Sequence, residues 1–213
     1  RQLPMLHTGD LLDVTTEGNE RFLEHTLTGL DLQLAIGNHE YQTRAVERYD
    51  PEPEKVRRRL QRFFRNDLTV ASRVMGGINF VSFDNARGNL REETIAGVRA
   101  EFDRPLPIVL LCHIPPFYTS KFLDNSVISK KRILRAQGAD EATINAVRRP
   151  KNNWDTYDRK TREFYAWTQT RPQLKAVLCG HTHFEEADGF SETSQMYVTG
   201  GNYEGYCQEI TFC

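Results

Sequence analysis

Four short apolar segments each end in a polar turn that contains Asp, Asn or His, and this repeated arrangement constrains the fold more than any other feature of the sequence. The segments are residues 3–6, 32–36, 107–112 and 174–179. Short apolar runs are typical of strands in a sheet that is covered on both faces. Between them, apolar residues recur with helical spacing at 17–30, 90–102 and 159–170. Alternating strands and helices predict an α/β fold whose helices cover the faces of the sheet.

The polar turns hold Asp10, Asn38 and five of the six histidines of the chain. These histidines are His7, His39, His113, His181 and His183. Because ligands of such sheets bind beyond the carboxyl ends of the strands, we expect the turns to converge on one rim. One histidine at a strand end is usually structural, and the turn at 37–40 alone would also suit an ordinary connection between a strand and a helix. The presence of several such residues at the predicted strand ends favours a metal site. Carboxylate, amide and imidazole ligands together suit Mn, Fe or Zn and are too rich in nitrogen for Ca or Mg.

The remaining pattern predicts a hairpin, further helices and closing strands. Residues 68–74 and 78–83 are rich in β-formers and flank a pair of glycines, which is typical of a hairpin. Residues 41–65 are polar with helical spacing, broken by Pro51 and Pro53. Helices are also expected near 130–135 and 141–147, and closing strands at 195–199 and 206–212.

The composition suits one globular domain, because the chain has 213 residues, 38% of them hydrophobic and 27% charged. We therefore expect residues 1–213 to form a single domain. The formal net charge is −1, but residues 120–162 carry eleven Lys and Arg against five Asp and Glu. A solvated helical face is the common cause of such a run; the alternative is a basic insertion, at about 118–155, that serves an anionic substrate. No interleaving of aromatic and basic residues accompanies this charge, which makes a nuclease and nucleic-acid binding unlikely.

The cysteines favour a reducing compartment such as the cytoplasm, and the lengths of the apolar runs argue against a membrane partner. Cys112 and Cys179 each close an apolar run. Cys207 and Cys213 lie too close together in the chain to stabilise it much if joined. The four cysteines therefore do not resemble a disulfide framework. No apolar run approaches the ~20 residues that a membrane span needs.

The four polar turns also carry sequence motifs in a particular order. They are GDLLD at 9–13, GNHE at 37–40, CHIPP at 112–116 and GHTH at 180–183. This order resembles the calcineurin-like metallophosphoesterase superfamily, and the motifs span nearly the whole chain. The resemblance implies a layered α-β-β-α sandwich of two mixed sheets with helices outside. It also implies two divalent metal ions, Mn, Fe or Zn, and hydrolysis of a phosphate ester by a metal-bound hydroxide.

Carried over position by position, the resemblance assigns five metal ligands: Asp10, Asn38, His113, His181 and His183. Asp10 would bridge the two metals, His183 would bind the first metal, and the other three would complete the shell of the second. His39 would bind no metal. It would hydrogen-bond the phosphate or act as the general acid that protonates the leaving oxygen.

Asp13 and Glu40 are expected to support the site from outside the ligand shell. Asp13 is the second acid of GDLLD, and Glu40 either orients His39 or serves as a favourable charge at a helix start. One motif of the family is missing, because no Asp-x-His precedes Asp10. That motif supplies two ligands of the first metal. We expect that the chain starts after it; the alternative is a non-catalytic relative that binds a metal or phosphate.

The basic segment lies between the third and fourth motifs, so it could fold over the metal rim as a lid that sets specificity. Candidate substrate contacts are Tyr118, Lys121, Trp154 and Tyr157. Ordinary loop packing explains these four residues equally well. The expected substrate is a phosphorylated small molecule, and the sequence distinguishes neither mono- from diesters nor one oligomeric state from another.

Overall fold

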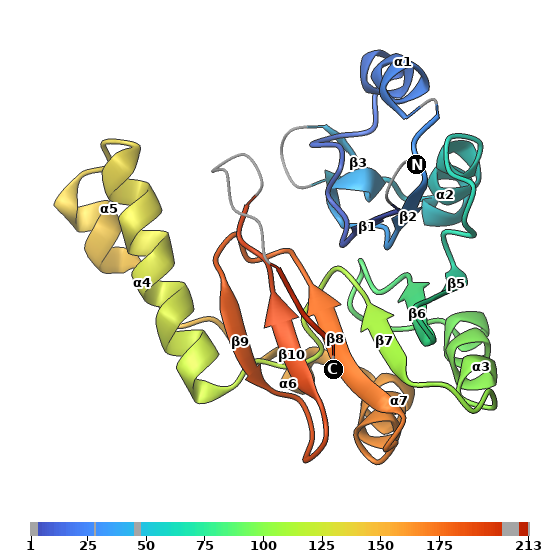
Figure 1. Ribbon diagram of the computed structural model, residues 1–213. Coiled ribbons are helices and arrows are strands. Elements are labelled where there is room, and N and C mark those ends of the chain that lie inside the picture. Colours follow the sequence, from blue (N-terminus) through green and yellow to red (C-terminus); the bar gives the residue numbers. More distant parts are fainter. Residues whose placement is uncertain (1–3, 28, 45–47, 202–208, 213) are drawn as a thin grey trace.

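The computed structural model describes residues 4–27, 29–44, 48–201 and 209–212 (Figure 1). Its strands are β1 (Met5–His7), β2 (Leu32–Leu34), β3 (Gln42–Arg44), β4 (Arg48–Tyr49), β5 (Val70–Met75), β6 (Ile78–Phe83), β7 (Ile108–Leu111), β8 (Leu174–Cys179), β9 (Glu186–Gly189) and β10 (Gln195–Val198). Its helices are α1 (Glu17–Thr26), α2 (Pro53–Gln61), α3 (Glu92–Glu101), α4 (Ser120–Ala136), α5 (Glu141–Ala146), α6 (Asn153–Thr156) and α7 (Arg159–Gln169), with a 3-10 turn η1 (His39–Tyr41) after β2. Each of the four predicted apolar strands overlaps one of these strands: β1, β2, β7 or β8.

Six of the strands form one mixed sheet in the order β5-β6-β7-β8-β10-β9. Strands β6, β7, β8 and β10 run parallel, and β5 and β9 pair antiparallel at the two edges. Strands β1 and β2 form a separate parallel pair, and β3 and β4 a small antiparallel pair. Because β7 and β8 are parallel neighbours, the turns that follow them meet at one edge, where the Gly180 N–H donates to the His113 carbonyl at 3.0 Å.

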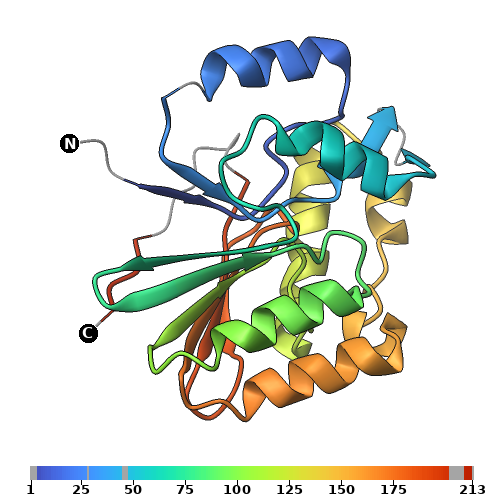
Figure 2. The ribbon, with the colours of Figure 1, turned by 90° about the vertical axis from the view of Figure 1, so that its right-hand side faces the viewer.

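The helices and sheets stack in four layers (Figure 2). Helices α1 and α2 cover the outer face of the β1–β2 pair, and α3 and α7 cover the outer face of the six-stranded sheet. Val109 and Leu110, neighbours in β7, belong to two different apolar clusters. Both faces of β7 are therefore buried, which explains its continuous apolar sequence. The predicted α-β-β-α layering is confirmed, while the smaller sheet is, within the described residues, the parallel β1–β2 pair and not a mixed sheet.

The basic segment forms helices that lie beyond β9, at the left of Figure 1. Helix α4 begins ten residues before the predicted 130–135, because the Thr119 hydroxyl caps it by accepting from the Phe122 N–H at 3.1 Å. Buried Glu186 of β9 pairs with Lys121 at 2.5 Å and also accepts from Asn125. These contacts attach the first turns of α4 to the edge of the large sheet.

Other predicted segments differ from the structure in informative ways. Residues 42–44 and 48–49 form the β3–β4 pair. Among the described residues, the helix predicted over 41–65 is limited to α2, which starts at Pro53 because proline suits the first helical turn. The hairpin prediction is confirmed, with Gly76 and Gly77 both at positive φ between β5 and β6. Of the predicted closing strand at 206–212, residues 209–212 form no strand and the rest lies outside the described residues.

Cys112 and Cys179 are free and buried, with their sulfur atoms 3.6 Å apart. Cys207 and Cys213 lie outside the described residues. None of the helices described combines the length and the apolar character that a bilayer-spanning helix requires. The apolar core is instead divided among the layers, and β7 lies at its centre.

We expect Ile108→Ala to lower the free energy of unfolding by about 2–5 kcal/mol, because Ile108 of β7 is fully buried and its truncation leaves a cavity. Ile128→Ala is the matched control, since Ile128 is 66% exposed on α4. It should change stability by about 0.5 kcal/mol or less. Urea unfolding followed by circular dichroism measures both, and equal losses would contradict the assignment of β7 to the core.

Candidate metal centre

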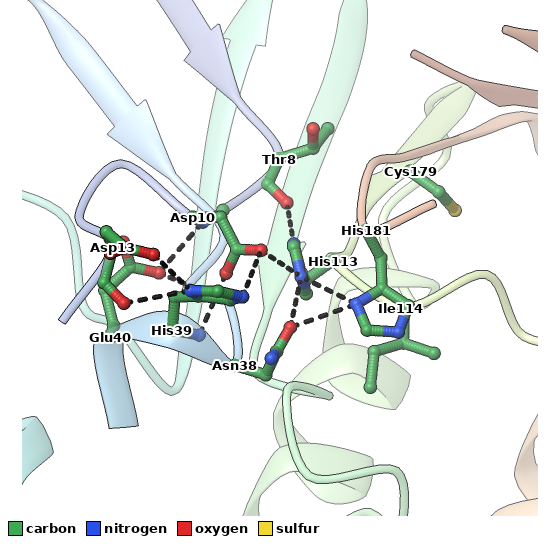
Figure 3. Close-up of polar contacts among 12 residues, drawn as sticks. Thr8, Asp10, Asp13, Asn38, His39, Glu40, His113, Ile114, Cys179 and His181 are labelled. Atoms are coloured by element: carbon green, nitrogen blue, oxygen red, sulfur yellow. Dashed lines mark hydrogen bonds and ion pairs between the residues drawn. The ribbon is translucent and has the colours of Figure 1, made fainter. Parts of the chain in front are cut away.

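Side chains from four separate turns converge at one edge of the sheets (Figure 3). Asp10 follows β1, Asn38 follows β2, His113 follows β7 and His181 follows β8. The His113 Nε2 atom lies 3.1 Å from Asp10 Oδ2 and 2.8 Å from Asn38 Oδ1. The His181 Nδ1 atom lies 3.0 Å from Asn38 Oδ1 and 3.2 Å from His113 Nε2. Four ligand atoms thus meet within a few ångströms of one another.

Hydrogen bonding determines which of these atoms carry lone pairs. The His113 Nδ1 atom lies 2.7 Å from the Thr8 carbonyl oxygen, which can only accept, so Nδ1 carries the proton. In neutral His113 the Nε2 atom therefore points a lone pair at the oxygens of Asp10 and Asn38. Lone pairs at these distances repel one another unless a proton or a cation lies between them. The donor set of imidazole nitrogen, amide oxygen and carboxylate oxygen fits the first-row divalent ion that the sequence predicts.

The surroundings keep His181 and Asp10 in their ligand forms at neutral pH. Burial, together with neighbouring His113, lowers the pKa of His181 to about 4, so its imidazole is neutral. Burial acts to raise the pKa of Asp10, but the hydrogen bond that His113 donates when its Nε2 carries a proton, the charge of His113 in that state and the contacts with His39 outweigh burial and lower that pKa. The carboxylate of Asp10 is therefore ionised and available to a cation.

The backbone at the site is strained. Asp10, His181 and His183 have φ values of 57°, 74° and 60°, in the left-handed region that disfavours residues with a side chain. Each such residue costs roughly 1–3 kcal/mol. Gly37 permits the close approach of two turns, since a Cβ there would overlap the backbone and carboxylate of Asp10. Strain of this kind, at three of the expected ligands, is typical of a functional site.

Glu40 holds the Asp10 turn in this conformation. Its fully buried carboxylate accepts from the backbone N–H groups of Asp10 at 2.9 Å, Leu12 at 2.9 Å and Gly37 at 2.7 Å. Burial and the nearby Asp10 carboxylate raise the pKa of Glu40 above its ordinary value. The sequence suggested that Glu40 orients His39 or provides a favourable charge at a helix start. These contacts do neither, because they join two turns that lie about thirty residues apart in the chain. Glu40 holds Asp10 in position.

Asn85 plays the same part for His113, and the sequence did not single it out. Its Oδ1 atom accepts from the backbone N–H groups of His113 at 2.9 Å and Ile114 at 3.0 Å. Its Nδ2 atom donates to the Ile114 carbonyl at 2.6 Å. Asn85 follows β6, so it is a further polar residue beyond the carboxyl end of a parallel strand. Its position just after the predicted strand at 78–83 is the signal that the sequence offers for this residue.

His39 faces the cluster without belonging to it. Its Nδ1 atom donates to Asp13, whose backbone oxygen lies at 2.9 Å and whose carboxylate oxygen lies at 3.1 Å. Its Nε2 atom lies 4.0 Å from Asp10 Oδ2. Burial acts to lower the pKa of His39, but the Asp10 carboxylate and the hydrogen bonds to Asp13 outweigh it and raise that pKa. The ring is thus oriented by Asp13 and disposed to carry a proton toward the cluster.

Two cavities adjoin the cluster. One, of about 360 Å³, is lined by Asp10, His113, His181 and His183 together with His7, whose Nδ1 accepts from the Gly9 N–H at 3.1 Å. His183 lies outside the group of closely spaced ligand atoms formed by Asp10, His113 and His181. The other cavity lies on the far side of His181 and His183, against α4.

The structure separates the four candidate substrate contacts. Tyr118 lines the cavity against α4, where its ring stacks on Phe122 at 4.4 Å. Lys121 is paired with Glu186, and Trp154 packs edge-on against Phe117 at 6.5 Å. Tyr157 is buried, with its hydroxyl 3.4 Å from the Pro115 carbonyl. Packing therefore accounts for three of the four positions, and a substrate role for any of them stays a prediction.

Comparisons with known proteins find a matching family model and solved structures that resemble this chain. The family model of the calcineurin-like phosphoesterases matches residues 4–185. A dimetal phosphatase from Danio rerio has a similar fold, with a TM-score of 0.53 and 10% identity over 93% of this chain and 73% of that one. A phosphopantetheinyl hydrolase from Mycobacterium tuberculosis gives a TM-score of 0.49 and 14% identity over 94% and 80% of the two chains. The comparison with curated proteins found no match.

We expect Asn85→Ala to weaken metal binding by about 10–100-fold, because the variant releases the turn that presents His113. Stability should also fall by about 1–3 kcal/mol, since two buried N–H groups lose their acceptor. Titration calorimetry with Mn²⁺ or Zn²⁺ measures the first effect and unfolding in chelator the second. Asn145→Ala, at an exposed position on α5, should alter neither. Wild-type metal affinity in Asn85→Ala would contradict the supporting role.

The lowered pKa of His181 predicts a loss of stability in acid for the metal-free protein. Between about pH 6.5 and pH 4 the unfolded chain binds a proton at this residue that the folded chain does not, so stability falls as pH falls. Unfolding in chelator at a series of pH values should therefore show a steeper decline for the wild type than for His181→Asn. Parallel curves for the two proteins would contradict the buried, neutral state of His181.

Proposed function

Because the chain belongs to the calcineurin-like phosphoesterase family, we propose that it is a metal-dependent hydrolase of phosphate esters whose substrates are phosphorylated small molecules. The convergence of lone pairs from Asp10, Asn38, His113 and His181 carries this proposal. A cation among these atoms would stabilise such an arrangement. Divalent ions such as Mn, Fe or Zn would supply Lewis-acid activation of water and neutralise the charge of the phosphoryl group.

The ligand roles follow from where the side chains lie. Asn38 and His113 contribute an amide oxygen and a nitrogen 2.8 Å apart, and His181 completes that side of the cluster. Asp10 has a second carboxylate oxygen, Oδ1, which accepts from the His39 N–H at 3.0 Å and fixes the orientation of the group. We propose that Asp10 bridges two metal positions, with His183 serving the position next to the cavity of about 360 Å³.

We propose that His39 is the general acid. In the reaction the oxygen of water bonds to phosphorus while the water loses a proton to solvent, and the bond from phosphorus to the alcohol oxygen breaks. The departing oxygen takes a proton from His39, which regains one from solvent. The raised pKa of His39 and its position 4.0 Å from Asp10 support the imidazolium as that donor. Asp13 acts through His39, since its two oxygens accept from Nδ1 and turn Nε2 toward the cluster.

A second candidate function is non-catalytic binding of a metal or phosphate. The observation that favours it is the small ligand set of the first metal position. Among the described residues, only Asp10 and His183 are proposed for that position, and the Asp-x-His pair of the family is missing before Asp10. Elemental analysis of protein equilibrated with Mn²⁺ or Zn²⁺ distinguishes the two. Two metals per chain with turnover of a phosphoester would support the hydrolase, and one metal without turnover would support the binding module.

We expect His39→Ala to lower kcat by about 10²–10⁴-fold for phosphate esters of alkyl alcohols, because these leaving groups need a proton. The loss should be smaller for p-nitrophenyl phosphate, whose leaving group departs as a stable anion. Metal content should be unchanged, since His39 is not one of the proposed ligands. Steady-state kinetics and elemental analysis measure these quantities.

His25→Ala is the matched control, because His25 is the one histidine outside the polar turns and is exposed on α1. Its kinetics should equal those of the wild type with both kinds of ester. Equal losses of activity on alkyl and p-nitrophenyl esters in His39→Ala would count against proton donation. Unchanged activity in that variant would remove His39 from the mechanism.

A further inference from the structure

A second cavity, of about 370 Å³, lies between α4 and the turn that follows β8. Its volume is within the range of about 300–1,000 Å³ that is usual for small-molecule sites. His181 and His183 line both this cavity and the one next to Asp10. A molecule in the second cavity would therefore lie directly beside the candidate metal ligands.

The wall of this cavity is largely apolar but contains two hydroxyl groups without partners. Phe122 and Ile133 of α4 face Phe184, which follows the metal-binding turn, and the rings of Phe122 and Phe184 are 5.0 Å apart. The hydroxyl oxygens of Ser129 and Thr182 are buried and have no hydrogen-bond partner among the described residues. Ser129 itself is only 8% exposed. Both oxygens lie inside the wall, so the surface that faces the cavity is mainly hydrocarbon.

The charge of the cavity has one sign. Lys130 and Arg148 line it, and no Asp or Glu occurs among the described residues of its wall. Lys130 is exposed, so its ammonium group can move toward a bound anion. The Arg148 guanidinium donates to the Asn145 carbonyl at 2.8 Å and keeps further N–H groups for a ligand. An acidic group on the ligand would find two cations here.

We propose that this cavity binds the alcohol portion of the substrate, and that the substrate is a small phosphoester with an apolar chain and a second acidic group. The proposal rests on the function proposed above, since the phosphoryl group would lie at the ligand cluster on the other side of His181. A wholly polar alcohol, such as a sugar, would gain no apolar contact from Phe122, Ile133 and Phe184. The wall therefore selects for hydrocarbon.

Contacts outside the cavity keep it open. Glu186 binds both Lys121 and Asn125 and so fixes the first turns of α4 to β9. Arg149, which follows α5, pairs with Asp124 at 2.9 Å and donates to the Ser120 carbonyl at 3.0 Å. The two ends of the α4–α5 segment are thus tied together at the base of α4. The substrate would enter a preformed site and would not have to order it.

The test uses monoalkyl phosphates from ethyl to octyl, each with and without a terminal carboxylate, and the matching alkylphosphonates, which are not hydrolysed. In the wild type loaded with Mn²⁺, the Kd of the phosphonates should fall by up to about fourfold for each methylene that becomes buried. The kcat/KM of the esters should rise in parallel. Titration calorimetry measures the phosphonates and a phosphate-release assay the esters.

Ile133→Trp fills the cavity and should abolish the dependence of the Kd on chain length. The Kd of octylphosphonate should rise at least tenfold. Ile128→Trp is the matched control, because the same substitution falls at an exposed position of the same helix; it should keep that dependence. Ser129→Leu fills the cavity from a second position, so that one misfolded variant does not decide the outcome. Lys130→Gln should remove the preference for the terminal carboxylate, and Lys131→Gln, at a position outside the cavity wall, should retain it.

The outcomes separate this inference from the proposed function. Phosphonate binding that depends on chain length and is lost in Ile133→Trp supports the alcohol site even where no ester is hydrolysed. Turnover with a Kd that is the same for ethyl and octyl, or an Ile133→Trp variant that behaves like Ile128→Trp, overturns the alcohol site and leaves the hydrolase intact.

Discussion

Repulsion between the lone pairs of Asp10, Asn38, His113 and His181 is the constraint on which the architecture of the site depends. Four atoms with lone pairs lie about 3 Å from their neighbours, although each comes from a different turn. Without a cation they repel one another wherever no imidazole proton lies between them, and the surrounding backbone holds the turns in place. The left-handed conformations of Asp10 and His181 are part of that cost, and the buried acceptors of Glu40 and Asn85 offset it. A bound divalent ion would turn the same repulsion into attraction, so metal binding and local stability are coupled.

The layered fold explains why these turns meet. Strands β7 and β8 are parallel neighbours in the large sheet, and β1 and β2 are parallel neighbours in the small one. The turns that follow the two strands of each pair therefore lie side by side at the same edge of their sheet. The two sheets then face each other through an apolar layer that contains Ala35 and Val109. Hydrogen bonds cross this gap, since the Gln33 amide of β2 donates to the Phe80 carbonyl of β6 at 3.1 Å. The rim is therefore shared by both sheets, and neither sheet alone could supply all four ligand atoms.

The sequence predicts those parts of the site that depend on residues close together in the chain. An apolar run followed by Asp, Asn or His predicts a strand end and a candidate ligand together. The structure brings the four residues predicted in this way, Asp10, Asn38, His113 and His181, to one edge of the sheets. The supporting contacts are different, because they join residues that are distant in the chain. Glu40 acts on a turn about thirty residues upstream and Asn85 on one 28 residues downstream, and no local pattern carries that information.

A similar limit applies to the basic segment. Its positive charge is visible in the sequence, but the pairing of Lys121 with buried Glu186 is not, because no apolar alternation marks β9 as a strand. The residues that line the cavity recur along α4 at helical spacing, as Phe122, Ser126, Ser129 and Ile133 do. An amphipathic helix would normally bury such a stripe against the core. Here the stripe also lines a cavity next to the turn that carries His181, with Lys130 and Arg148 in the same wall, so this helix is shaped for a ligand as well as for packing.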